Sequence, residues 1–350
     1  MVIDNCLTTF GADMSERQST VVICGATAGV GRATAHAFAQ AGYRVALIAR
    51  GHDGLDDTRA ELEAKGANVL AISADVADSD AVDRAAEQVE KELGPINVWV
   101  NAAMATVFGP VEQITAAEYK RVTDVTYLGF VHGTLAALRY MQPRDRGTIV
   151  QVGSALAYRA IPLQSAYCAA KFAIRGFTDS LRCELIHNKS HVRLTMVQLP
   201  AHNTPQFDWS RNKMQKRPQP VPPIHTPDVA ARAILRAATE APRELWLGSA
   251  SLKAIIGNMF MPGLLDKMLA KQAWSGQMTD EPANPEQPDN LYEPVEGLHR
   301  VEGRFDDQIK DNAIALSSET VGKLAVAGLA AVTVGAVALV ASIASGRSRR

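Results

Sequence analysis

The chain has 350 residues, of which 47% are hydrophobic. This length suits one α/β domain of about 250 residues with an extension, and the composition is sufficient for a large core. Lysine and arginine together number 36 against 37 aspartates and glutamates, so the formal net charge of -1 provides no basic field to hold nucleic acid.

The cysteine pattern and the N-terminal residues indicate the compartment of the protein and whether a metal site is expected. The 4 cysteines form no C-x-x-C pair and the 8 histidines show no zinc spacing, so we expect a reducing compartment and no metal site. Asp4, Asp13 and Glu16 interrupt the first residues, which therefore do not resemble a secretory signal. We interpret residues 1–18 as an N-terminal tail.

Apolar runs alternate with helix-like stretches from residue 21 to about residue 248, as in successive βαβ units. This alternation predicts a doubly wound parallel α/β sheet of about seven strands, occupying residues 19–272. The candidate strands are residues 21–24, 45–49, 69–73, 96–100, 148–152, 192–197 and 245–247.

A glycine-rich turn follows the first candidate strand, with Gly25, Gly29 and Gly31 in G-x-x-x-G-x-G spacing. Glycines permit a tight turn and a close approach of backbone N–H groups to a diphosphate, and the following helix N-terminus adds partial positive charge. A purely structural turn is the alternative. The position directly after an apolar run favours a dinucleotide site.

This turn resembles that of the short-chain dehydrogenase/reductase family, and the resemblance extends from about residue 19 to residue 247. It implies a Rossmann-type fold, an oxidoreductase activity and a nicotinamide cofactor. It also implies cofactor contacts from Thr27 and Val30 within the turn, and family members often form homo-oligomers.

The residues after the second and third strands bear on the cofactor. A preference for NAD(H) would require a carboxylate for the ribose 2′-hydroxyl, yet Ala49 offers none. Arg50 suits a 2′-phosphate, so NADP(H) is expected, unless Arg50 is simply solvated. Asp75 and Val76 resemble the family's adenine contact, although Asp75 could instead cap the next helix.

Two departures from the family pattern follow. The family's N-N-A-G reads Asn101-Ala102-Ala103-Met104 here, and we expect Asn101 and Ala102 to support the cofactor. The asparagine of the catalytic helix is replaced by Thr126, whose hydroxyl could hold the water of the proton relay but lacks the geometry of an amide.

Ser154, Tyr167 and Lys171 form the expected catalytic group. Ser154 lies just after the fifth candidate strand, at the carboxyl end where doubly wound sheets bind ligands, and would hold the substrate oxygen. Tyr167 and Lys171 lie at i and i+4, on one face of a helix. The ammonium is expected to lower the phenol pKa so that Tyr167 acts as general acid and base. By resemblance, Lys171 also reaches the nicotinamide ribose.

The region after the sixth strand is expected to close the site. Thr204 resembles the family's partner of the nicotinamide carboxamide, and we assign no chemistry to His202. The proline-rich stretch 200–227 is either a lid or a mobile surface insertion. A lipophilic substrate would follow if a set of apolar residues formed the lid, and ordinary core is the alternative reading. These residues are Phe207, Trp209, Ile255, Ile256, Met259, Phe260 and Met261.

The C-terminal part changes character twice. Residues 273–320 are acidic and proline-rich, which predicts a linker or a strap over the domain. Residues 321–345 form a candidate membrane helix, because the stretch from Leu324 to Ala344 contains no charge, and residues 346–350 form a basic tail. A buried helix or a disordered end is the alternative. We expect a cytoplasmic domain anchored by this helix.

The combined prediction is a membrane-anchored, NADP(H)-dependent oxidoreductase that interconverts a small-molecule carbonyl and an alcohol. The alternative is a membrane-tethered nucleotide-binding sensor or scaffold with little or no turnover, which the replacement at Thr126 favours.

Overall fold

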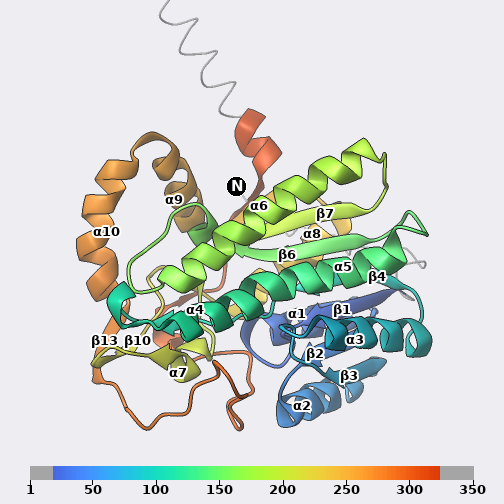
Figure 1. Ribbon diagram of the computed structural model, residues 1–350, viewed down its shortest axis with the longest axis horizontal. Coiled ribbons are helices and arrows are strands. Elements are labelled where there is room, and N and C mark those ends of the chain that lie inside the picture. Colours follow the sequence, from blue (N-terminus) through green and yellow to red (C-terminus); the bar gives the residue numbers. More distant parts are fainter. Residues whose placement is uncertain (1–18, 324–350) are drawn as a thin grey trace, which may run out of the picture.

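An eight-stranded sheet in the order β15-β12-β7-β6-β4-β1-β2-β3 runs through the computed structural model, which describes residues 19–323 (Figure 1). The strands from β12 to β3 are parallel, and β15 pairs antiparallel with β12 at one edge. The strands are β1 (Thr20–Cys24), β2 (Arg44–Ala49), β3 (Val69–Ser73), β4 (Ile96–Asn101), β6 (Thr148–Ser154), β7 (Arg193–Leu199), β12 (Glu244–Leu247) and β15 (Ala315–Ser317).

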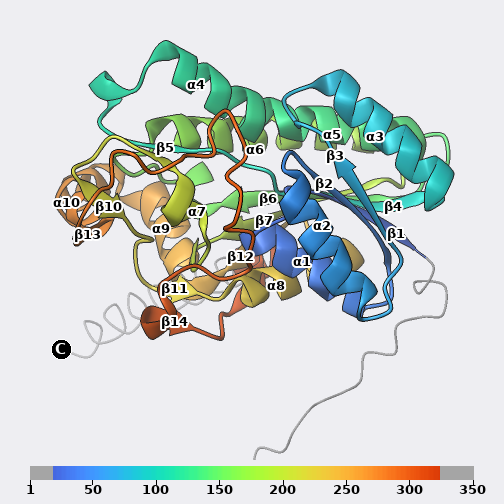
Figure 2. The ribbon, with the colours of Figure 1, turned by 90° about the horizontal axis from the view of Figure 1, so that it is seen from below.

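Helices cover both faces of this sheet, as the doubly wound prediction requires (Figure 2). One layer holds α1, α2 and α8, and the other holds α3, α4, α5 and α6. The helices are α1 (Gly29–Gln40), α2 (His52–Glu63), α3 (Ser79–Glu92), α4 (Ala116–Thr123), α5 (Gly129–Met141), α6 (Ser165–His187), α7 (Gln206–Trp209), α8 (Pro227–Glu240), α9 (Gly248–Phe260) and α10 (Pro262–Gly276), with 3-10 turns η2 (Val111–Gln113), η4 (Ala155–Ala157) and η5 (Asp306–Gln308) and a π-helix η3 (Asp124–Leu128).

The alternation of side chains along β1 explains the two layers. Val21 and Ile23 pack into the core beneath α1, α2 and α8, whereas Val22 and Cys24 pack into the core beneath α3 to α6. A strand buried on both faces is apolar at most of its positions, which is why the predicted runs are nearly continuous. The order in which strands are added to the sheet reverses between β1 and β4, and doubly wound sheets bind ligands in the crevice at such a switch point.

Residues 200–227, which were predicted to be a lid or a mobile surface insertion, form several short elements. We call this stretch the lid. Three small sheets join it to neighbouring segments: β8 (Ala201–His202) with β11 (Ile224–His225) and β14 (Ile309–Lys310), β10 (Lys216–Pro218) with β13 (Met278–Pro282), and β5 (Val107–Phe108) with β9 (Arg211–Asn212).

The described part of the 273–320 segment is built into the domain. It contributes β13, β14 and β15, and the expected boundary at residue 272 falls inside α10, because this helix continues through the buried Ala273. We name residues 289–306 the strap. Its backbone meets the start of α1, where Gly29 N–H donates to the Arg300 carbonyl, and Figure 2 shows the orange to red chain crossing the end of the sheet there.

Within residues 19–323, no helix is both long and apolar enough to cross a bilayer. The predicted membrane helix, from Leu324 to Ala344, lies outside the described residues, as do the basic tail 346–350 and the N-terminal tail 1–18.

Candidate active site

A cavity of about 430 Å³ opens at the carboxyl ends of the parallel strands. It brings together most of the residues that the sequence predicted for the site. These are Gly25, Thr27, Gly29, Val30, Gly31, Arg50, Asp75, Val76, Ala102, Ser154, Tyr167, Lys171 and Thr204.

The glycine-rich turn is packed so closely that a side chain at any of its three glycines would contact neighbouring atoms. A Cβ added at Gly31 would lie 1.9 Å from the Gly25 carbonyl oxygen, and one at Gly25, whose φ is +84°, would lie 2.7 Å from Ala103 Cα. A Cβ at Gly29 would lie 3.0 Å from Thr204 Cγ2. The cap residue Ala28 makes no side-chain hydrogen bond to the start of α1. Because these positions carry no side chains, a diphosphate can approach the backbone of this turn, which we call the glycine-rich cradle.

Ser154, Tyr167 and Lys171 meet beside this cradle. Ser154 ends β6, and its hydroxyl interacts with the Tyr167 phenol from α6. One turn further along α6, the buried Lys171 Nζ donates to the Val152 carbonyl at 2.8 Å and lies 5.5 Å from the Tyr167 ring centroid. A hydroxyl, a phenol and an amine thus share one wall of the cavity.

Burial dominates the electrostatics of this group. Burial raises the pKa of Tyr167, and the hydrogen bond from Ser154 opposes that rise. Burial also lowers the pKa of Lys171 to about 7. The expected lowering of the Tyr167 pKa by Lys171 is therefore not seen, because both groups are desolvated and desolvation disfavours phenolate and ammonium alike.

Arg50 and Asp75 lie on the opposite side of the cavity. Arg50 follows β2 and donates to the backbone carbonyls of Tyr292 at 2.8 Å and Asn290 at 2.6 Å, so it is not simply solvated. Asp75 accepts from Arg121 Nη2 at 2.6 Å and from a backbone N–H. The cap of α3 is Asp78 instead of Asp75, which removes the capping alternative.

Two residues expected at the site lie beneath it. The Asn101 amide donates to Gln151 at 2.9 Å and accepts from the Trp99 indole at 2.9 Å, within a buried network. The Thr126 hydroxyl donates to the Ala105 carbonyl and accepts from the Ala105 N–H, each at 2.9 Å. Neither side chain is among the described residues that line the cavity. The polar groups of both side chains are hydrogen-bonded to other residues of the protein interior.

The apolar residues named as a lid divide into two groups. Phe207 and Trp209 are buried and line the cavity, together with Pro220 to Pro222. Ile255 packs in a separate core cluster with Tyr158 and Trp246. The other four are exposed on the outer surface of α9 and just beyond it: Ile256 by 37%, Met259 by 63%, Phe260 by 78% and Met261 by 52%.

The sequence analysis did not identify the cavity residues of the strap. Asn290, Pro294, Val295 and His299 line the same cavity as the glycine-rich turn, although they follow it by more than two hundred residues. Proline and acidic content predicted a linker or strap here, and no local pattern marks these side chains as part of a site.

Comparison with known sequences supports the family resemblance. Residues 19–215 match the short chain dehydrogenase family. An uncharacterized oxidoreductase of Bacillus subtilis, YxnA, is 33% identical over 286 residues, which are 81% of this chain and 80% of that protein. The 3-ketodihydrosphingosine reductase of Bos taurus is 31% identical over 192 residues, 53% of this chain and 57% of that enzyme.

Solved structures with the same fold include a short-chain dehydrogenase from Streptomyces avermitilis, with a TM-score of 0.61 at 26% identity over 73% of this chain and 97% of that one. A variant of actinorhodin polyketide ketoreductase with NADPH aligns with a TM-score of 0.52 at 26% identity, over 54% of this chain and 73% of that one. The family match contains the glycine-rich turn, Ser154, Tyr167 and Lys171, whereas the strap lies outside it.

Proposed function

The chain belongs to the short chain dehydrogenase family of oxidoreductases, and from that premise we propose that it is an NADP(H)-dependent enzyme interconverting a carbonyl and an alcohol. The observation that carries the proposal is the meeting of Ser154, Tyr167 and Lys171 in one cavity with the glycine-rich cradle.

The protein's own residues would handle the oxygen and the proton. The nicotinamide, when bound, supplies or accepts the hydride. Ser154 donates a hydrogen bond to the substrate oxygen and holds it against Tyr167. Tyr167, kept protonated by burial, gives its proton to that oxygen as negative charge develops, and takes it back in the reverse direction. Lys171, with a pKa of about 7, then stabilises the phenolate and returns the proton.

The cofactor assignment depends on Arg50. No carboxylate stands at Ala49, and the guanidinium at the end of β2 lines the cavity, so this end of the site suits a 2′-phosphate better than a free 2′-hydroxyl. The glycine cradle would hold the diphosphate, with Thr27 and Val30 beside it, and Thr204 would contact the carboxamide. Ala102, Asp75 and Val76 would flank the adenosine.

The proposed substrate is lipophilic. The rest of the cavity wall is mixed: it contains polar residues such as Gln164, Gln219 and Ser251, and many apolar side chains. The apolar side chains include Leu156, Ile161, Phe207, Val221, Ala254 and Leu269. The similarity to a 3-ketodihydrosphingosine reductase supports this substrate class.

A second candidate is a membrane-tethered nucleotide-binding sensor or scaffold with little turnover. The position of Thr126 favours it. The Thr126 hydroxyl donates its proton to the Ala105 carbonyl, so it is not available to hold the water of the proton relay.

NADPH consumption across a panel of ketones and aldehydes, with Tyr167→Phe as the comparison, separates the two candidates. The enzyme proposal predicts turnover by the wild type and a loss of about a hundredfold or more in kcat for the variant, because the transferable proton is missing. NADPH affinity should be unchanged. Cofactor binding without turnover on any carbonyl would favour the sensor, and retention of most of kcat would refute the role of Tyr167.

A further inference from the structure

The strap contacts the cofactor half of the cavity through its backbone. Its carbonyls accept from the Arg50 guanidinium, as described above, and the Leu291 carbonyl accepts from Arg121 Nε at 2.9 Å. The Arg300 carbonyl accepts from Gly29 N–H at 2.9 Å, and the His299 carbonyl accepts from Arg32. These donors surround the places proposed above for the 2′-phosphate, the adenine and the diphosphate.

Strap side chains also face this part of the cavity. Asn290, Pro294, Val295 and His299 line it. Asn290 Oδ1 and His299 Nδ1 are buried polar atoms without a hydrogen-bond partner among the described residues. The His299 side chain is 7% exposed and fits against α2 only because Gly54 has no side chain, since a Cβ there would lie 2.4 Å from His299 Nδ1. Buried polar atoms normally have hydrogen-bond partners, so these two atoms are free to bond a ligand in the cavity.

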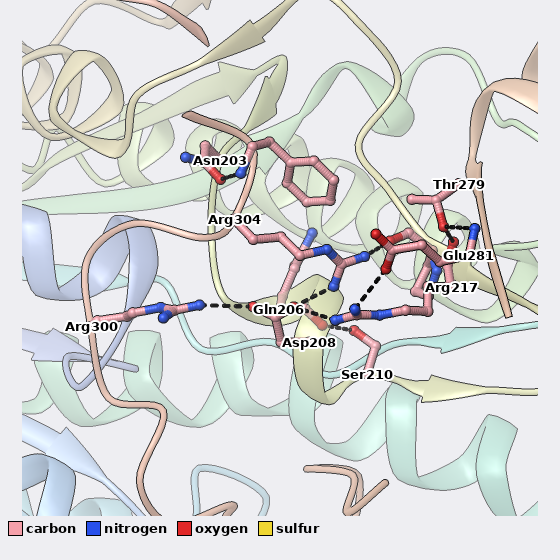
Figure 3. A network of polar contacts seen from close by, with 11 residues as sticks. Asn203, Gln206, Asp208, Ser210, Arg217, Thr279, Glu281, Arg300 and Arg304 are labelled. Carbon is pink, nitrogen blue, oxygen red and sulfur yellow. Dashed lines mark hydrogen bonds and ion pairs between the residues drawn. The ribbon is translucent and has the colours of Figure 1, made fainter. Parts of the chain in front are cut away.

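The position of the strap is held by a charged cluster around Asp208 on α7 (Figure 3). The Asp208 carboxylate, 9% exposed, pairs with Arg300 at 3.1 Å, with Arg304, and with Arg217 at 3.4 Å. Arg217 also pairs with Glu281 at 2.8 Å, which connects the cluster to β13. One buried carboxylate therefore joins the lid and the strap.

Asn203, at the start of the lid, provides a second attachment. Its amide donates to Asp306 at 2.7 Å and accepts from Phe305 N–H at 3.1 Å. Asn203 itself lies between His202 and Thr204, which line the cavity.

We infer that the strap is a cofactor-binding element that completes the adenosine and 2′-phosphate end of the site, and that Asp208 is its positioning residue. This inference rests on the proposed function. The strap carbonyls fix the Arg50 guanidinium before the cofactor arrives, and preorganisation of this kind lowers the cost of binding. Because strap residues line the same end of the cavity, we expect the rate of cofactor release to depend on how firmly the strap is held.

The test measures NADPH binding to the full chain by the fluorescence of the reduced nicotinamide, with stopped-flow release rates. Asp208→Asn should raise both Kd and koff about tenfold, a change equivalent to about 1.4 kcal/mol. Arg300→Ala should give a smaller change of the same sign. Its side chain is 49% exposed and pairs with Asp208 alone among the described residues, so this variant decides the matter if Asp208→Asn fails to fold.

Arg139→Ala is the matched control, since it removes an exposed arginine paired with Asp83 between α5 and α3, and NADPH binding should not change. Unchanged Kd and koff in both test variants would overturn the inference while leaving the proposed function intact. Tighter binding would overturn it too, because the strap would then compete with the cofactor. A wild type that binds no NADPH would instead refute the proposed function.

Discussion

Lys171 is the residue at which folding and catalysis make opposite demands. Its amine is 3% exposed and donates to the Val152 carbonyl, and burial lowers its pKa from 10.5 to about 7. The folded pKa thus lies below the unfolded one. Below pH 7 the amine is protonated in both the folded and the unfolded state, so the folded state bears the full cost of burying the ammonium. Between pH 7 and the unfolded pKa, the amine has lost its proton in the folded state only. The free energy of unfolding therefore rises with pH across this range.

Lys171→Met should therefore stabilise the protein at pH 6, by an amount on the order of a few kcal/mol, and by much less at pH 10. Urea unfolding of the wild type and the variant at both pH values measures the difference, and all other titrating groups cancel in the comparison. An equal difference at both pH values would show that the amine does not lose its proton within the folded protein.

Arg50→Asp should reverse the cofactor preference. The substitution removes a charge-assisted contact with the 2′-phosphate and places a like charge there, so NADPH affinity should fall about ten- to a hundredfold while NADH loses far less. Titration of each cofactor gives the ratio. Arg59→Asp on α2 is the control, because it makes the same charge change at a side chain that is 44% exposed and outside the cavity lining. A wild type that already prefers NADH would contradict the assignment.

Among the elements, the π-helix η3 carries the departure from the family pattern. It inserts a wide turn between α4 and α5, and Thr126 within it is 0% exposed and bonds both backbone groups of Ala105. The π-helix thereby fixes the segment after β4, where Ala102, Ala103 and Met104 line the cavity. We infer that Thr126 holds the backbone of this segment in place and has a structural role.

Thr126→Val keeps the shape of the side chain and removes its hydroxyl. It should lower the free energy of unfolding by about 1–3 kcal/mol, because two buried backbone groups lose their partner. Under stabilising conditions kcat should change little. Thr123→Val, which removes an exposed hydroxyl bonded to the Tyr119 carbonyl in the preceding turn, is the control. A large fall in kcat without loss of stability would instead give Thr126 a place in the proton relay.

At the scale of the whole molecule, the C-terminal part belongs to the domain up to the last described residues. The strand β15 extends the sheet beside β12, and Val321 packs against the cluster that contains Tyr158 and Trp246. A truncation intended to remove the proposed anchor must therefore begin after Lys323, later than the start of the predicted helix at residue 321.

The full chain should sediment with membranes, whereas a chain ending at Lys323 should stay in the supernatant and bind NADPH with the same affinity. A chain ending before Ala315 is the control for a truncation that damages the domain. It should lose β15 and therefore unfold at a lower temperature. Full-length protein recovered without detergent would refute the proposed anchor.

The features of this protein that depend on a local pattern of residues could be predicted before the structure was known. Continuous apolar runs predicted the parallel strands because a strand buried on both faces tolerates few polar residues. The glycine spacing and the i, i+4 pair Tyr167 and Lys171 predicted the cavity wall, since both motifs need only a turn or one helix face to bring their groups together.

Which of the remaining side chains face the cavity, and which bond elsewhere, depends on the packing of distant parts of the chain. Asn101 and Thr126 occupy family positions, yet partners at Gln151 and Ala105 hold their polar groups beneath the site. The strap reaches the glycine-rich turn through contacts more than two hundred residues apart in the chain, which no local pattern can encode. The pKa shifts of Tyr167 and Lys171 likewise follow from burial, a property of the packed molecule.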